Sequence, residues 1–164
     1  YDRPEIAAEE LPADAYRDDV AANLAVAERW VTEHPDTEFD FFLPPYSILF
    51  WDKVIREGRT EAVFAAIRQA GQTLLQYDNV KFYGYLMDPE IVTNLDNYCD
   101  YIHHSGGVCR EILAMLQREE GRLTEENLEE TLANWREFVV HYDYDQFWDE
   151  RFWIQWNAEH AAAP

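Results

Sequence analysis

Apolar residues recur at helical spacing near the start of the chain. Within residues 14–33, the apolar positions that share one helical face are Tyr16, Val20, Leu24, Ala27 and Val31. Pro12 precedes this segment and the turn sequence HPDTE follows it. The pattern predicts an amphipathic helix over residues 14–33, because residues three and four positions apart lie on the same side of a helix.

Two short runs are apolar without a helical period. FDFFLPP occupies residues 39–45, and VKFYGYL occupies residues 80–86. Each run is too short for a typical helix, and the first ends in two prolines. Continuous apolar character over this length is typical of a strand that is buried on both faces. We therefore predict two strands.

Helical patterns lie between these strands and after them. We predict a helix from Ile48 to Glu57 that ends at Gly58, and another that begins at Thr60. Two strands joined by crossover helices predict a parallel sheet with a right-handed crossover. Further along the chain we predict a helical turn over residues 89–95, a helix over residues 105–118, a helix capped by Thr124, and an aromatic tail over residues 144–156.

Two strands make an incomplete parallel sheet, because both edges would expose unpaired backbone groups. Either further strands escape the pattern or the chain is part of a larger sheet. The chain also begins with Tyr1 rather than Met, which suggests a processed or truncated product. We expect the open sheet edge to be covered by the N-terminal half of the same protein or by a second copy in a homo-oligomer.

The chain is strongly acidic. It holds 33 Asp and Glu residues against 13 Lys and Arg residues, a formal net charge of −20. Nucleic acids and anionic membranes would repel such a chain, so we exclude nucleic-acid binding. Its 164 residues, 48% of them apolar, suffice for one domain with a sizeable core. The sequence shows no run as long as a membrane span and no signal peptide.

The stretch NYCDYIHHSGGVCREIL, residues 97–113, concentrates side chains that carry chemistry. Asp100 stands three residues before His103, so in a tight turn its carboxylate reaches Nδ1 of the imidazole and fixes the tautomer. Nε2 then faces outward as a general base. Ser105 is placed to cap the helix that follows. In the alternative interpretation, the Asp–His hydrogen bond only holds the turn together.

Other interpretations of this stretch are weaker. A metal site could be assembled from Asp96, Asp100, His103 and His104. No further ligand cluster supports that site, so we assign neither a metal nor a cofactor. Cys99 and Cys109 are too few and too far apart for a thiolate metal site, and we interpret them as buried thiols or as one disulfide.

The motifs around Asp100 and His103 resemble a known family. The block LDNYCDYIH, followed by a serine and a helix, looks like the C-terminal Asp-x-x-His block of SGNH (GDSL-type) hydrolases of bacteria. The upstream FFLPPYSILFW and YDNVKFYGYLMDPE also resemble the C-terminal half of such proteins. The resemblance covers roughly residues 15–142. It implies a three-layer, helix-rich α/β/α flavodoxin-like parallel sheet, of which this chain is only the C-terminal part.

The resemblance also implies an activity. His103 would be the base and Asp100 its orienting partner in a serine esterase or O-acyl transferase that acts on acylated carbohydrate or cell-envelope material. The nucleophilic serine would lie outside this chain, which alone would be inactive, and the location would be extracytoplasmic or on the cell surface. We expect residues 1–142 to belong to this domain and residues 143–164 to form an aromatic tail. The alternative is a non-catalytic acidic interaction module on a hydrolase scaffold.

Overall fold

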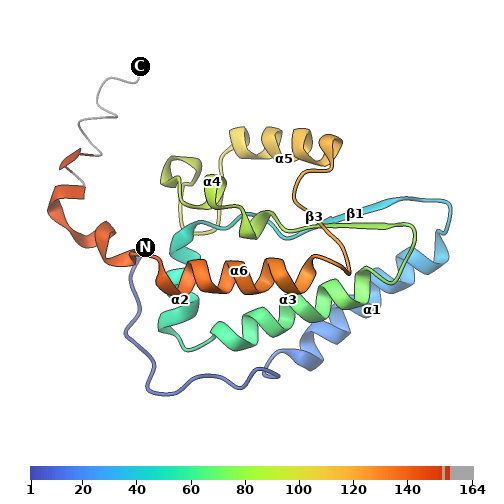
Figure 1. Cartoon of the computed structure of the whole chain (residues 1–164), viewed down its shortest axis with the longest axis horizontal. Helices are drawn as coiled ribbons and strands as arrows, with labels where there is room; N and C mark the ends of the chain where they lie inside the picture. Colours follow the sequence, from blue (N-terminus) through green and yellow to red (C-terminus); the bar gives the residue numbers. More distant parts are fainter. Residues whose placement is uncertain (153, 156–164) are drawn as a thin grey trace.

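The computed structural model describes residues 1–152 and 154–155 (Figure 1). In chain order the elements are α1 (Arg17–Glu33), β1 (Phe39–Phe42), α2 (Ile48–Arg56), α3 (Thr60–Leu74), β2 (Val80–Tyr83), the 3-10 turn η1 (Tyr85–Met87), α4 (Pro89–Val92), the 3-10 turn η2 (Leu95–Asn97), α5 (Gly106–Arg118), β3 (Arg122–Leu123), α6 (Leu128–His141) and the 3-10 turn η3 (Tyr144–Trp148). The predicted helices and both predicted strands are present. Trp153 and Trp156 of the predicted aromatic tail lie outside the described residues.

The sheet is small and mixed. Strand order is β1-β2-β3, with β1 parallel to β2 and β3 antiparallel to β2. The parallel pair was predicted, but β3 was not, because its two residues are too few to show a period. The helix-rich α/β class is confirmed. The finer prediction of a flavodoxin-like parallel sheet is not confirmed, since the described strands form a mixed sheet of three.

Helices cover the two faces of the sheet unequally. Helix α5 lies on one face, whereas α1, α2, α3 and α6 lie on the other (Figure 1). On the crowded face α3 contacts α1, α6 and β2. Helix α3 therefore lies between α1 and α6, beneath the central strand.

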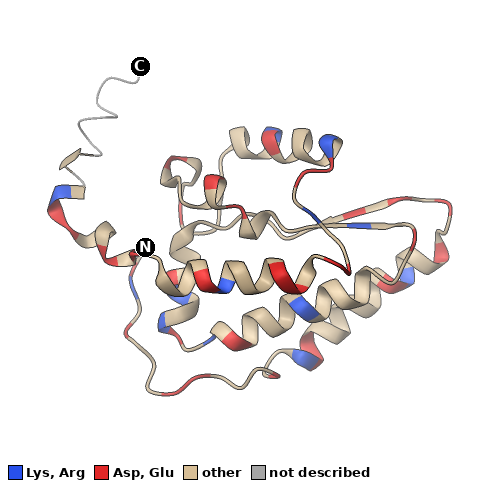
Figure 2. Ribbon diagram, in the orientation of Figure 1, with Lys and Arg blue, Asp and Glu red and all other residues tan. Residues whose placement is uncertain are grey.

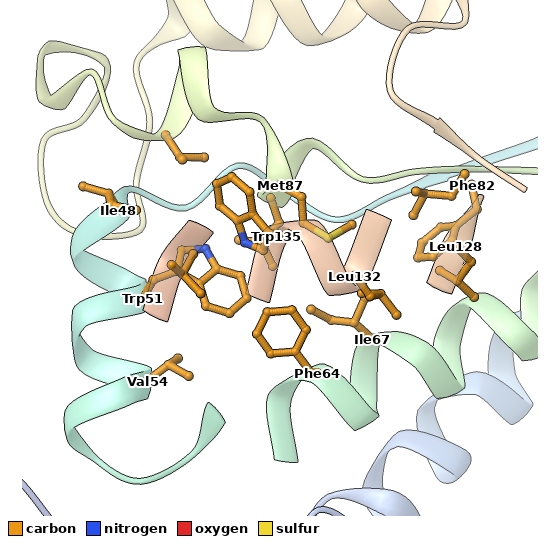
Figure 3. Packing of buried hydrophobic residues seen from close by; sticks show 14 of the residues in the cluster. Ile48, Trp51, Val54, Phe64, Ile67, Phe82, Met87, Leu128, Leu132 and Trp135 are labelled. Carbon is orange, nitrogen blue, oxygen red and sulfur yellow. The ribbon is translucent and has the colours of Figure 1, made fainter. Parts of the chain in front are cut away.

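Aromatic side chains dominate the core on that crowded face. The ring of Trp51 on α2 lies 5.2 Å from Phe64 on α3 and 6.0 Å from Trp135 on α6, measured between ring centroids. Ile67 and Leu132 extend the cluster along α3 and α6 (Figure 3). Large aromatic rings bury much apolar area per residue, so a few of them suffice to join three helices.

The N-terminal segment crosses the end of α2 at Gly58. The Ala7 amide donates to the Arg56 carbonyl and the Leu11 amide to the Gly58 carbonyl, each at 2.7 Å. Gly58 has φ +64°, and a Cβ there would lie 2.6 Å from the Glu9 carbonyl oxygen. Only glycine accommodates both the left-handed backbone and the close approach of the N-terminal segment. Helix α2 therefore ends before Gly58, as predicted.

The two predicted helix caps have different outcomes. Ser105 caps α5, accepting from the Val108 amide at 3.5 Å, as expected. Thr124 makes the reciprocal hydrogen bonds of a cap with Asn127, but in the turn that precedes the next helix. The Thr124 hydroxyl accepts from the Asn127 amide within a turn, and α6 begins only at Leu128.

Acidic side chains are spread over the N-terminal segment, the helices and the loops rather than gathered on one element (Figure 2). Among the described residues, no helix is both long enough and apolar enough to cross a membrane. Tyr144 and Phe147 of the aromatic tail are buried in the main core cluster. The first part of the described tail thus packs on the body of the molecule, whereas Trp148 and Ile154 are exposed.

Candidate functional site

The loop that carries Asp100 and His103 rests on the segment that follows β1. The amide and the hydroxyl of Ser47 both donate to the Tyr101 carbonyl, at 3.1 and 2.9 Å. The Tyr98 hydroxyl donates to the Pro45 carbonyl at 2.9 Å. The loop therefore lies at the carboxyl ends of the two parallel strands, the edge where open α/β sheets bind ligands.

Within this loop, Asp100 organises the backbone and one imidazole. Its Oδ1 accepts from the amides of Ile102 and His103, at 2.8 and 2.7 Å, and its Oδ2 lies 2.6 Å from His103 Nδ1. The His103 hydrogen bond and then these two amides lower the pKa of Asp100 to about 2. The predicted Asp–His contact is therefore present.

The surroundings of this pair differ from those of a serine triad. The His103 side chain is 70% exposed and that of Asp100 is 47% exposed. Both serines of the chain are engaged elsewhere, Ser47 with the Tyr101 carbonyl and Ser105 with the Val108 amide. Within the described residues, neither serine hydroxyl is hydrogen-bonded to His103. The catalytic assignment of Asp100 and His103 stays a prediction.

The neighbouring thiols differ from expectation. Cys99 and Cys109 are both free and exposed, so the prediction of buried thiols or a disulfide is wrong. Cys109 Sγ lies 3.6 Å from His104 Nδ1, and the Cys99 thiol donates to the His103 carbonyl at 3.2 Å. Over the part of the chain that the structure describes, no group of three or more His, Cys, Asp or Glu residues is placed to hold a metal ion.

A hollow of about 350 Å³ lies beside the carboxyl end of β2. Sequence reasoning did not identify it. Its lining comes from η1, α4, β3 and α6: Gly84, Tyr85, Met87, Asp88, Pro89, Glu90, Gly121, Arg122, Leu123 and Thr131. Neither Asp100 nor His103 lines it.

Two glycines meet at this hollow. The Gly84 amide donates to the Gly121 carbonyl at 3.0 Å. A Cβ on Gly84 would lie 2.7 Å from Met87 Cε, and one on Gly121, where φ is +70°, would lie 3.1 Å from the Tyr85 ring. The backbone segments at Gly84 and Gly121 therefore pack so closely against Met87 and Tyr85 that neither position has room for a side chain. The available sequence signal was Gly84 inside the strand pattern VKFYGYL, because an isolated glycine within such a pattern indicates close backbone approach.

The lining of the hollow carries charges of both signs. Arg122 supplies a guanidinium whose Nη1 lies 2.8 Å from Glu119. Asp88 and Glu90 supply carboxylates, and Asp88 Oδ1 accepts from the amides of Glu90 and Ile91. Met87 and Leu123 add apolar surface. A ligand there would meet a cation, two anions and an apolar wall.

Two buried phenols lie next to the hollow. The hydroxyls of Tyr83 and Tyr85 have no hydrogen-bond partner among the described residues. Their rings stack with centroids 5.7 Å apart beneath α5. Burial, followed by the neighbouring Tyr83, raises the pKa of Tyr85 to about 12. Tyr85 is therefore a neutral phenol at physiological pH, and this residue is one of those that line the hollow.

Comparison with known proteins points away from the predicted family. The chain is 24% identical over 90 residues to a "UPF0735 ACT domain-containing protein" of Lacticaseibacillus casei (strain BL23), and equally so to a protein of the same name from Lacticaseibacillus paracasei. Each match covers 55% of this chain and 62% of the relative, so the chain spans less than two thirds of the relatives' length. No family model matches, and no solved structure matches.

These relatives overturn the SGNH prediction. They are named for an ACT domain and not as hydrolases, so assignment to the SGNH family, with the esterase or acyltransferase activity it implied, is wrong. The alternative prediction, a non-catalytic interaction module on a hydrolase scaffold, is also wrong, because it assumed the same hydrolase scaffold. At 24% identity over about half the chain, the match is a similarity to ACT domain-containing proteins and does not establish a family.

Proposed function

We propose that the chain is a binding domain for a small zwitterionic molecule and that the hollow beside Gly84 and Gly121 is its site. The observation that carries the proposal is the lining, which places one guanidinium and two carboxylates around a space of about 350 Å³. That volume falls at the lower end of small-molecule sites, which span roughly 300–1,000 Å³. Its place at the carboxyl end of β2 agrees with the general location of ligands in α/β sheets.

The charges select the ligand class. A guanidinium pairs well with a carboxylate, because its N–H groups form a planar fork, so Arg122 would receive the anionic group. Asp88 and Glu90 would receive an ammonium group, since ionised carboxylates only accept hydrogen bonds. Met87 and Leu123 suit a short apolar side chain. These contacts together describe a small amino-acid-like zwitterion.

A second hollow, of about 400 Å³, shares Arg122 and Leu123 of β3 with the first. It is lined by Asp78 and Val80, so it lies at the amino end of β2. The general location of ligands at carboxyl strand ends favours the first hollow. The Gly84–Gly121 approach also belongs to the first hollow alone.

The test is a binding titration with three related probes. We expect L-leucine to raise the melting temperature and to bind in calorimetry, because a ligand that binds only the folded state stabilises it. Leucine methyl ester lacks the carboxylate and N-acetyl-leucine lacks the ammonium group. Each should bind about tenfold more weakly or worse, since a lost charge-assisted hydrogen bond costs about 1.5–3 kcal/mol.

Two matched variants test the role of Arg122, which lines both hollows. Arg122→Gln should abolish leucine binding, whereas Arg118→Gln should preserve it, because Arg118 pairs with Glu111 and Glu120 and does not line the hollow. The proposal fails if leucine at about 10 mM neither stabilises the protein nor releases heat. It also fails if the ester binds as well as leucine, or if Arg122→Gln binds normally.

A further inference from the structure

A thiol and an imidazole lie in contact next to the start of α5. Cys109 Sγ lies 3.6 Å from His104 Nδ1, and the thiol is exposed to solvent. With the ring proton on Nε2, Nδ1 accepts a hydrogen bond from the thiol. Neither residue lines the hollow beside Gly84 and Gly121. The pair is therefore separate from the proposed binding site.

The backbone on both sides fixes this pair. His104 pairs with Tyr98 in a short antiparallel bridge, and next to it the Ser105 amide donates to the Asn97 carbonyl at 2.7 Å. Cys109 is the fourth residue of α5, and its amide donates to the Ser105 carbonyl at 3.2 Å. Because Ser105 is held both beside the bridge and by the helix, the imidazole and the thiol are kept within reach of each other.

The first turn of α5 provides a positively charged environment. The amide groups at a helix N-terminus carry partial positive charge, which stabilises an anion there. The Arg110 guanidinium folds back over the same turn, where its Nη1 would lie 3.9 Å from a Cβ on Gly106 and its Nη2 4.0 Å from one on Gly107. The nucleophile in sulfur chemistry is the thiolate rather than the thiol. Cys109 therefore has a base that can take its proton and a setting that suits the charge left on sulfur.

Cys99 provides a contrast within the same loop. Its thiol is also exposed, but it donates to the His103 carbonyl at 3.2 Å. A backbone carbonyl accepts a hydrogen bond without taking the proton, whereas a neutral imidazole can take it. Cys99 also precedes α5 and is not part of its first turn. The two thiols therefore share access to solvent but differ in the group that faces their proton.

We propose that Cys109 is a site of reversible modification by small disulfides, with His104 as its base. His104 Nδ1 takes the thiol proton, and Cys109 Sγ attacks one sulfur of the disulfide. The bond between the two sulfurs of the small molecule breaks as the bond to Sγ forms, and the departing thiolate takes the proton from His104. One disulfide is exchanged for another, so the step needs no separate oxidant.

Single-thiol variants of the full chain test the pair. Cys99→Ala retains only the Cys109 thiol, and Cys109→Ala retains only the Cys99 thiol. Each variant is incubated with oxidised glutathione at about pH 7, and mass spectrometry of the intact protein follows the mixed disulfide. We expect Cys109 to react about tenfold faster, because an unassisted thiol is only slightly ionised at about pH 7. The net charge of −20 repels this anionic reagent from both thiols, so the ratio of the two rates reports the local difference.

His104→Gln separates a base from a structural role. In the Cys99→Ala background it should lower the rate at Cys109 to about that of Cys99, and in the Cys109→Ala background the rate at Cys99 should not change. His141→Gln removes an imidazole that contacts Glu137 on α6, and it should change neither rate. Equal rates at the two thiols, faster reaction at Cys99, an unchanged rate at Cys109 in His104→Gln, or a fall at both thiols in that variant would each overturn the proposal.

Discussion

Arg3 holds the buried carboxylate of Asp52 with two side-chain nitrogens. Arg3 Nε lies 2.9 Å from Asp52 Oδ2, and Arg3 Nη2 lies 2.9 Å from Oδ1. Asp52 is 1% exposed, and the Tyr1 hydroxyl donates to it as well. These contacts join the first residues of the chain to α2. The N-terminal segment is therefore part of the folded unit.

Arg3→Gln should strongly destabilise the protein. The substitution leaves Asp52 buried without its cation, and breaking a buried ion pair on one side costs about 3–5 kcal/mol. Urea unfolding measures the loss. Arg17→Gln removes two exposed ion pairs, with Asp14 and Asp18, and should change the unfolding free energy by less than about 1 kcal/mol. Equal effects of the two substitutions would contradict the buried pair.

The Asp100 carboxyl should titrate near pH 2. Its folded pKa lies below the ordinary value, so the group stabilises the folded state above the unfolded pKa of about 4, and this contribution is lost as the pH falls toward 2. Side-chain carboxyl NMR shifts report the midpoint. In His103→Ala the midpoint should rise, because the largest cause of the shift is removed. An unchanged midpoint would show that the imidazole does not bind Asp100 in solution.

Gly121→Ala should destabilise the protein by about 1–2 kcal/mol, because a side chain at positive φ is strained and its Cβ would press on the Tyr85 ring. Gly106→Ala provides the control. A Cβ there has no neighbour closer than Arg110 Nη1 at 3.9 Å, and alanine favours the helix. Thermal unfolding should therefore order the variants Gly106→Ala, wild type, Gly121→Ala from most to least stable. The reverse order of the two substitutions would refute the close approach at the hollow.

Ser47→Ala should loosen the loop that carries His103. The hydroxyl of Ser47 is buried and donates to the Tyr101 carbonyl, so its loss should cost about 1 kcal/mol. Amide exchange of Ile102 and His103 should accelerate, because the loop loses one anchor. Thr32→Ala, at an exposed helix position, should leave both properties unchanged. A Ser47→Ala protein with unaltered loop exchange would show that the serine does not hold the loop.

Local features followed closely from local sequence. Helix α1 begins three residues after the predicted start and ends at the predicted residue, because apolar spacing sets which side of a helix can be buried. Ser105 caps α5, and Asp100 binds His103, because both contacts join residues three positions apart. Such short-range pairs depend little on the rest of the chain.

The sequence by itself determined the helices, the two longer strands and the internal geometry of the Asp100 loop. Only the tertiary structure decided the third strand and the hollow. Strand β3 has two residues, and it exists because it pairs with Phe82 and Tyr83. Gly84 and Gly121 lie on either side of α5 in the sequence and meet through a backbone hydrogen bond, so no local pattern could reveal that they border one hollow. Contacts between distant segments depend on how the layers pack, and the period of apolar residues along one segment does not encode that packing.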